Sequence, residues 1–275
     1  VAALKAGKVV VSANKAVICQ KGAQIFEAAE KSGGAYFFEA SVAGGIPIIK
    51  VLREGLVANR FSLIYGILNG TCNYILDNMT RNGLGYDEAL KQAQSLGYAE
   101  ANPSTDVDGI DTWHKVILSS NIAFGVSLDK ATVPVAGLPN ITAADVENFK
   151  AHGLVCKLIS TGKRVEGGYS VYVHPTLVKA GELEAAVPLN YNLITFQGET
   201  SDRMADIPLH IMWWRIWWTF WRAGASTPPT ARPSRPTTPA CSGSTSGAAG
   251  TARWKRPGAM PSSPLLWRWA KFTPG

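Results

Sequence analysis

The sequence is poor in cysteine and histidine and has no metal-binding spacing. Its 4 cysteines are scattered, with no CxxC pair, and its 4 histidines are equally dispersed. This pattern argues against a transition-metal site. No secretory leader is recognisable at the start. We therefore expect free, buried thiols and a cytoplasmic location.

Acidic residues are missing from one region of the chain. The formal net charge of the 275 residues is +7, but residues 1–206 are nearly neutral and residues 207–275 contain no Asp or Glu. Nothing in the body of the chain predicts a nucleic-acid partner. The basic region also holds most of the tryptophans and prolines, in a tract that does not build a stable core. We predict an aberrant, disordered tail over residues 191–275.

Three interpretations of this tail stay open. The apolar run over residues 211–221 contains Arg215 and is shorter than the ~20 residues that a span requires, so we expect no membrane span. Tryptophan together with arginine is typical of a membrane-surface anchor, and the basic charge also suits a polyanion. A shifted reading frame explains the abrupt change of composition, and it is the interpretation we favour.

A glycine-rich GxGxxG turn is also missing. The chain starts with a pattern that reads as the end of a helix closing at Gly7, and strand and helix patterns then alternate over residues 9–40. Such alternation is typical of a parallel α/β sheet. The turn that binds the pyrophosphate of a dinucleotide in such sheets has no counterpart here. We expect residues 1–40 to be the C-terminal part of an incomplete, Rossmann-like nucleotide-binding domain.

Residues 97–115 contain the highest density of candidate catalytic side chains. Asn102-Pro103 forbids a continuous helix, so Glu100 is expected on a turn. The apolar residues that follow recur at helical spacing, which places Asp111 and Lys115 on one helix face. Taken alone, such a pair is most often a solvated surface ion pair. The sequence thus predicts a carboxylate on a turn before a helix that carries a carboxylate–ammonium pair.

Three other segments join strand ends to polar or glycine residues. Ser12-Ala13-Asn14-Lys15 follows a predicted strand, and ligands of α/β sheets gather at such ends. Gly44-Gly45 follows another strand and precedes a helix. The predicted strand 59–68 leads to Asn69-Gly70-Thr71, where Asn69 or Thr71 can cap a helix. A loop without a ligand, or a simple cap, explains each residue type equally well.

These segments together resemble the homoserine dehydrogenase family. The central pattern matches the family signature at Ala93, Gly97-Tyr98-Ala99, Asn102-Pro103, Asp106-Val107, Gly109, Asp111 and Lys115. The Ser-Ala-Asn-Lys segment and the run from Asn69 to Leu76 match as well. The resemblance covers residues 1 to about 190 and implies an α/β protein. The NAD(P)-binding part would end at residue 40, followed by an α+β substrate and dimerisation domain over residues 41–190 and a homodimeric assembly.

The resemblance implies an NAD(P)-dependent oxidoreductase. Its reaction is the reversible reduction of L-aspartate 4-semialdehyde to L-homoserine, in threonine, methionine and isoleucine biosynthesis. Lys115 would stabilise or protonate the aldehyde oxygen, Asp111 would orient Lys115, and Lys15 would hold the substrate against the nicotinamide. Glu100 and Asp106 would bind the substrate. Two alternatives stay open: a non-catalytic remnant that dimerises or binds an amino acid, and a surface binder that acts through the tail.

The resemblance also implies contacts with NADP or NAD and with a monovalent cation. The cofactor-binding residues would be Ser12, Asn14, Lys15 and Gly44. The family holds Na⁺ or K⁺ largely through backbone carbonyls in the loop after the second strand. Here that cation site would consist of Glu39, Val42, Gly44 and Ile46.

Overall fold

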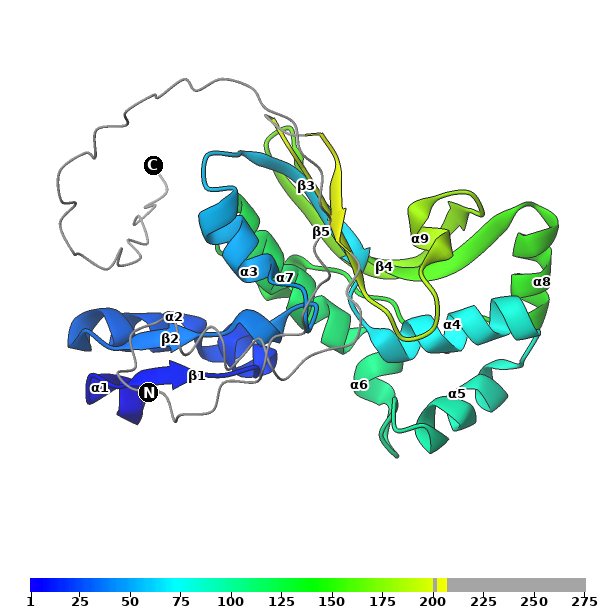
Figure 1. The fold of residues 1–275 in the computed structure, drawn as a ribbon, viewed down its shortest axis with the longest axis horizontal. Helices are drawn as coiled ribbons and strands as arrows, with labels where there is room; N and C mark the ends of the chain where they lie inside the picture. Colours follow the sequence, from blue (N-terminus) through cyan, green and yellow to red (C-terminus); the bar gives the residue numbers. More distant parts are fainter. Residues whose placement is uncertain (200–201, 207–275) are drawn as a thin grey trace, which may run out of the picture. The chain divides into compact units, whose positions relative to one another are not determined.

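The computed structural model describes residues 1–199 and 202–206 of the chain, which all fall within one unit (Figure 1). The greater part of the predicted tail, residues 207–275, lies outside this description. The interpretations of that tail as a surface anchor or a frame-shifted segment therefore stay predictions. Within the described residues no helix is both long and apolar enough to cross a membrane.

The first elements form a small parallel unit, drawn in blue in Figure 1. They are α1 (Ala2–Lys5), β1 (Val9–Val11), α2 (Lys15–Ser32) and β2 (Ala35–Phe37). β1 pairs with β2 in parallel, so α2 is the crossover that this pairing requires. The side chain of Asn14 caps α2, and Gly33 ends the helix in the left-handed conformation. The predicted alternation of strand and helix is confirmed.

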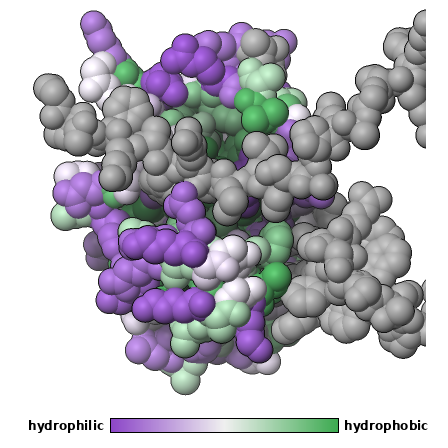
Figure 2. All heavy atoms as spheres, turned by 90° about the vertical axis from the view of Figure 1, so that its left-hand side faces the viewer, coloured by the Kyte–Doolittle hydropathy of each residue, from purple (hydrophilic) through white to green (hydrophobic). Residues whose placement is uncertain are grey.

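A tightly turned segment connects this unit to the rest of the fold. It contains the 3-10 turn η1 (Glu39–Ser41), α3 (Ile48–Lys50) and the π-turn η2 (Val51–Gly55). Ala43 and Gly44 both have positive φ angles, of 53° and 55°, which reverse the chain between η1 and α3. Figure 2 views the molecule from the side of the blue elements and shows hydrophilic residues over much of that face.

Five strands form the second sheet. They are β3 (Phe61–Ile67), β4 (Leu154–Val165), β5 (Gly168–Lys179), β6 (Leu193–Gly198) and β7 (Met204–Asp206). The order is β5-β4-β3-β6-β7, with every neighbouring pair antiparallel. This part of the chain is therefore α+β, as predicted, whereas the β1–β2 pair has the parallel pairing of an α/β sheet. The domain boundary at residues 40 and 41 stays a prediction.

Helices cover the two faces of this sheet unequally. They are α4 (Gly70–Asn82), α5 (Tyr86–Ser95), α6 (Ser104–Val107), α7 (Ile110–Phe124), the 3-10 turn η3 (Lys130–Thr132), α8 (Ala143–Ala151) and α9 (Leu183–Ala186). α4, α7 and α8 pack on one face, where Leu158 joins the largest core cluster. The neighbouring Ile159 points to the opposite face, where it packs with Val187 just after α9. Figure 1 shows α4 and α9 on opposite sides of β4.

β6 and β7 correct the start of the predicted tail. Residues 193–198 and 204–206 are strands, although the sequence prediction placed them in a disordered segment from residue 191. β6 pairs with β3 and buries Ile194 and Phe196 in the core beside α3. The six-residue strand is short, and the unusual composition that follows it hides its local signal. The described part of the fold thus includes β6 and β7.

Candidate active site

The predicted site residues come together where three helices begin. α2 presents Lys15 in its first turn, α4 is capped by Asn69, and α7 carries Asp111 and Lys115. The short helix α6 adds Asp106. Because the N-terminal end of a helix carries a partial positive charge, this arrangement favours ionised carboxylates.

Asp111 is the centre of the cluster. Its Oδ1 lies 2.7 Å from Lys15 Nζ and its Oδ2 lies 2.6 Å from Lys115 Nζ, so one carboxylate binds two ammonium groups. The Asp111 side chain is only 8% exposed. Burial raises the pKa of this carboxyl, but the charges of Lys115 and Lys15 outweigh burial and hold the pKa at about 2. Asp111 is therefore ionised at any physiological pH.

Lys115 is held by two acceptors and keeps access to solvent. Besides Asp111, its Nζ donates a 2.6 Å hydrogen bond to the backbone carbonyl of Leu68, at the end of β3. An ammonium group has three hydrogens, so two are used by these contacts. The side chain is 15% exposed, and its remaining hydrogen can meet a small molecule. The geometry suits a fixed proton donor.

Asp106 occupies a second carboxylate position beside this pair. Its Oδ1 accepts a 2.8 Å hydrogen bond from Asn69 Nδ2, and its Oδ2 lies 3.5 Å from Thr71 Oγ1. Burial raises the pKa of Asp106, and the charge of Asp111 adds to this, whereas the Asn69 hydrogen bond and the nearby lysines oppose it. The site thus contains two carboxylates of different character. Asp111 is ion-paired, whereas Asp106 is partly open.

Glu100 lies at the rim of the cluster rather than inside it. It is exposed in the loop between α5 and α6, outside any helix, as predicted. Its backbone carbonyl accepts a hydrogen bond from Gln94 Nε2, and its carboxylate has no ion pair within residues 1–199 and 202–206. The loop approaches the site because Thr71 Oγ1 donates a 2.6 Å hydrogen bond to the carbonyl of Tyr98.

Ser12 and Asn14 build the turn that presents Lys15. The Asn14 backbone N–H donates to Ser12 Oγ at 3.1 Å, and Asn14 Oδ1 accepts from the backbone N–H of Val17 at 3.1 Å. The Lys15 side chain is 32% exposed at this turn. Both polar residues thus have structural partners, and their predicted contact with a cofactor is a separate hypothesis.

The predicted cation loop is bound to the start of α3. The Glu39 carboxylate accepts backbone hydrogen bonds from Ile49 at 2.9 Å and Lys50 at 3.0 Å, and burial raises the pKa of this carboxyl. Val42 is fully buried, and the loop turns at Gly44. The Ile46 carbonyl accepts from the backbone N–H of Ile48. The predicted ligands therefore lie in one well-packed turn, where Glu39 has a role without any ion.

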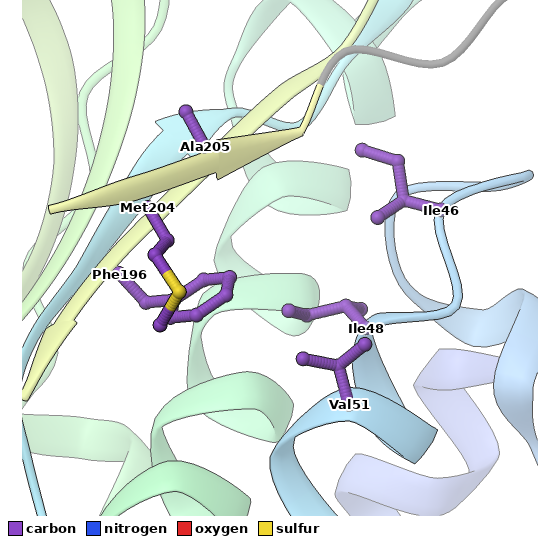
Figure 3. Close-up of a pocket in the computed structure, with 6 residues that line it drawn as sticks. All are labelled: Ile46, Ile48, Val51, Phe196, Met204 and Ala205. Carbon is purple, nitrogen blue, oxygen red and sulfur yellow. The ribbon is translucent and has the colours of Figure 1, made fainter. Parts of the chain in front are cut away.

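A cavity beside the Glu39 loop has none of the charged groups that the Asp111 cluster contains. It has a volume of about 430 Å³ and lies between α3 and the strands β6 and β7 (Figure 3). Its lining is apolar and consists of Ile46, Ile48, Val51, Phe196, Met204 and Ala205. No acid, base or nucleophile lines it, so the charged cluster is the better candidate for catalysis.

Sequence reasoning missed the contacts of Asn69 with the two carboxylates. Asn69 was expected as a possible helix cap, which the structure confirms, because its Oδ1 accepts the Cys72 backbone N–H at 2.8 Å. Its Nδ2 also donates to Asp106 and, at 3.0 Å, to Asp111. No local pattern reveals such a bridge, since the two carboxylates lie far from Asn69 along the chain.

Comparisons with known proteins show which family the chain resembles. A family model described as homoserine dehydrogenase matches residues 47–207. A homoserine dehydrogenase of Pseudomonas aeruginosa is 44% identical over 197 residues, which are 72% of this chain and 45% of that protein. One from Neisseria gonorrhoeae is 42% identical and covers 67% of this chain and 42% of that protein. The chain therefore spans about half the length of the curated relatives it matches.

Solved structures give the same result. The homoserine dehydrogenase of Thiobacillus denitrificans has a TM-score of 0.73 at 42% identity, covering 75% of this chain and 48% of that one. A hyperthermophilic archaeal homoserine dehydrogenase in complex with NADPH has a TM-score of 0.65 at 26% identity, covering 75% and 59%. The likeness extends over most of the residues that the structure describes.

Proposed function

The chain belongs to the homoserine dehydrogenase family, and we propose that its charged cluster performs the reversible reduction of L-aspartate 4-semialdehyde to L-homoserine. The observation that carries this proposal is the pairing of both Lys15 and Lys115 with Asp111. This contact joins the start of α2 to α7, the helix that contains the last two positions of the family signature. A reaction between two bound molecules requires catalytic side chains at the place where the two binding regions meet.

Lys115 acts on the carbonyl oxygen of the aldehyde. When bound, a nicotinamide cofactor would supply hydride to the aldehyde carbon, and the aldehyde oxygen would then carry negative charge. The Lys115 ammonium stabilises that charge and donates the proton that completes the alcohol. Asp111 and the Leu68 carbonyl hold the Nζ atom in one place, so little reorganisation is required during the reaction.

Carboxylates bind the amino end of the substrate. The α-ammonium group of aspartate semialdehyde needs a negative partner, and Asp106 is the partly open carboxylate of the cluster. Glu100, exposed at the rim, supplies a second negative charge. Lys15 holds the substrate at the side of the cofactor, which sets the approach of the two reactants.

The residues present fit the reactive end of a nicotinamide cofactor. Ser12 and Asn14 form a turn at the carboxyl end of β1, where α/β sheets bind ligands, and Lys15 is partly exposed beside it. The backbone turn at Gly44 is a further contact candidate. These residues include no glycine-rich turn for the pyrophosphate, so they account for the nicotinamide end alone.

A monovalent cation in the Glu39 loop remains part of the proposal. Its supporting observation is Ser41, whose buried hydroxyl has no hydrogen-bond partner among the described residues of this polar turn. Val42, Gly44 and Ile46 would supply carbonyl oxygens, the ligands that Na⁺ and K⁺ share with other hard cations. Glu39 would balance the charge.

Assembly and location complete the proposal. We infer a homodimer, because Leu177, Leu183 and Leu189 expose large apolar side chains near α9 and the end of β5. Cys19, Cys72 and Cys156 are free thiols, which supports a reducing, cytoplasmic compartment. The biosynthesis of threonine, methionine and isoleucine is the setting that the family implies.

A two-part assay of the purified chain tests this function. NADPH and NADH binding is followed by nicotinamide fluorescence, and L-homoserine binding by calorimetry. Turnover is followed by the oxidation of NADPH in the presence of aspartate semialdehyde. We expect L-homoserine binding that is lost in Asp106→Asn and turnover that is lost in Lys115→Ala. Binding without turnover would support the non-catalytic alternative, and the absence of both would refute the proposal.

A further inference from the structure

Asn69 connects the two carboxylates of the cluster through a single amide group. Its Nδ2 lies 2.8 Å from Asp106 Oδ1 and 3.0 Å from Asp111 Oδ2. An amide nitrogen carries two hydrogens, so each carboxylate receives one. The residue is 5% exposed, and it occupies the loop between the end of β3 and the start of α4.

The orientation of this amide is fixed by the backbone. Asn69 Oδ1 accepts the Cys72 backbone N–H at 2.8 Å, and only the oxygen end of the side chain can accept this bond. The nitrogen end is therefore directed at the carboxylates. Reversing the amide would place an oxygen against two carboxylates and leave the Cys72 N–H without its partner, at a cost of ~1–3 kcal/mol for a buried donor.

Asp111 is buried and Asp106 is partly buried, and two carboxylates this close together repel each other. Without a donor between them, one would take up a proton or the pair would separate. Lys115 and Lys15 neutralise Asp111, but Asp106 has no lysine within ion-pair distance among the described residues. The Asn69 amide is the close donor to the Asp106 carboxylate, because the single hydrogen of the Thr71 hydroxyl is donated to the Tyr98 carbonyl and the Thr71 oxygen lies 3.5 Å from Asp106 Oδ2.

We propose that Asn69 is a positioning residue whose amide holds Asp106 and Asp111 at a fixed separation, so that substrate bound by Asp106 lies in register with Lys115. This inference rests on the proposed function. Lys115 shares Asp111 Oδ2 with the Asn69 amide, so the amide also sets the position of the proton donor. Loss of the bridge is expected to weaken substrate binding at acidic pH, where Asp106 then becomes protonated.

The charges around the bridge determine the sign of this effect. Asp106 experiences Asp111 and Lys115 of α7 and Lys15 of α2. The neighbouring Cys72 of α4 is deeply buried, and burial raises the pKa of its thiol well above the ordinary value, so it stays neutral. Removing the Asn69 donor leaves burial and the Asp111 charge, which both raise the pKa of Asp106.

Asn69→Ser separates the bridge from the helix cap. Serine is a good N-cap residue and preserves the bond to Cys72, but it has no amide to span two carboxylates. Asn69→Asp also caps the helix and adds a third carboxylate, so its effect on Asp106 is expected to be larger. Asn82→Ser is the matched control, because Asn82 lies at the other end of α4, where its amide bonds only Asn78 among the described residues.

Two measurements on the full chain test the inference. Aspartate carboxyl carbons are labelled with ¹³C, and the titration of Asp106 is followed by NMR. L-Homoserine binding is measured by calorimetry from pH 5 to pH 9, and thermal melting verifies the fold. In Asn69→Ser we expect the titration of Asp106 to move up by about one pH unit and binding at the acidic end to weaken about tenfold. Asn82→Ser should match the wild type in both.

The outcomes separate the inference from the proposed function. An unchanged Asp106 titration in a folded Asn69→Ser protein would reduce Asn69 to a helix cap and overturn the inference. A shifted titration, with L-homoserine bound by the wild type and weakened in the variant, supports it. If the wild type binds no L-homoserine, the proposed function fails, and the titration alone still decides whether Asn69 holds the two carboxylates.

Discussion

Two lysines of this protein each lie near an aspartate but differ in their exposure to solvent. Lys115 lies 2.6 Å from Asp111 with 15% of its side chain exposed, whereas Lys157 is fully buried on β4 and lies 3.9 Å from Asp77. Burial lowers the pKa of Lys157 to about 8, although the charge of Asp77 opposes this. A perturbed lysine in an unknown protein often suggests catalysis. Here the lysine with the lowered pKa is the one that no substrate can reach.

The partners of each lysine explain the difference. Lys157 Nζ donates to Asn73 Oδ1 at 2.9 Å and to the Val187 carbonyl at 2.7 Å, and Asn73 also donates to the backbone of this segment. These bonds fasten the chain after α9 to α4 and the sheet. Lys115 instead faces the junction of α2, α4 and α7, where one hydrogen stays available. Access, together with a carboxylate in contact, therefore distinguishes Lys115, the proposed proton donor, from the buried Lys157.

The largest expected effect comes from removing Lys115. Lys115→Ala should lower turnover by a factor of about 10²–10⁴, the usual contribution of a positioned proton donor, with a smaller effect on substrate affinity. Steady-state reduction of aspartate semialdehyde measures both. Lys157→Met is the control, because it removes the fully buried ammonium. Equal losses of turnover in the two folded variants would abolish the distinction drawn between the two lysines.

Titration of Lys157 should change the free energy of unfolding as the pH changes. Its folded pKa of about 8 is below the unfolded value, so the unfolded chain binds more protons between these two pH values. Stability must therefore rise with pH in that window. Relative to Lys157→Met, the wild type should gain on the order of 3 kcal/mol in the free energy of unfolding from pH 8 to 10.4, as an upper bound. Urea unfolding measures this, with the exposed Lys163→Met as control. A slope equal to that of the variant would contradict the prediction.

Asp111 should affect the free energy of unfolding at acidic pH. Its folded pKa of about 2 is below the unfolded value, so the stability it contributes is present above pH 4 and is lost as the pH falls towards 2. The loss should be about 2 kcal/mol. Asp106 contributes with the opposite sign, because its pKa is raised. The test is therefore the difference in unfolding free energy between wild type and Asp111→Asn at pH 5 and pH 3, and a constant difference would refute it.

The sequence predicted local features of the site better than its long-range contacts. Helical spacing placed Asp111 and Lys115 on one helix face, the family resemblance implied their roles, and residue type alone indicated that Asn69 could cap α4. The contact of Lys15 with Asp111 joins residues almost a hundred positions apart, and only the folded chain brings them together. The family resemblance placed both residues in one active site, but their direct pairing was not predicted.

The fold shows the same limit. The parallel β1–β2 pair was predicted from its alternation of strand and helix, since only α2 separates the two strands. The chain around Lys157 was predicted as a strand, but the burial of that lysine depends on its hydrogen bond to Val187, which follows later in the chain. β6 was missed because its six residues gain their burial from pairing with β3. Short segments stabilised by distant partners carry weak local signals.

A third ion pair, between Lys31 and Glu27, extends the comparison and is expected to have the smallest effect on stability. Lys31 Nζ lies 2.6 Å from Glu27 Oε1 on α2, the same distance and i,i+4 spacing as in the Lys115–Asp111 pair. Here both side chains are mostly exposed, at 74% and 60%, so water and salt screen the attraction. Lys31→Ala should therefore leave the melting temperature unchanged at physiological salt. A loss as large as that of Asp111→Asn would show that distance and not burial ranks the ion pairs of this protein.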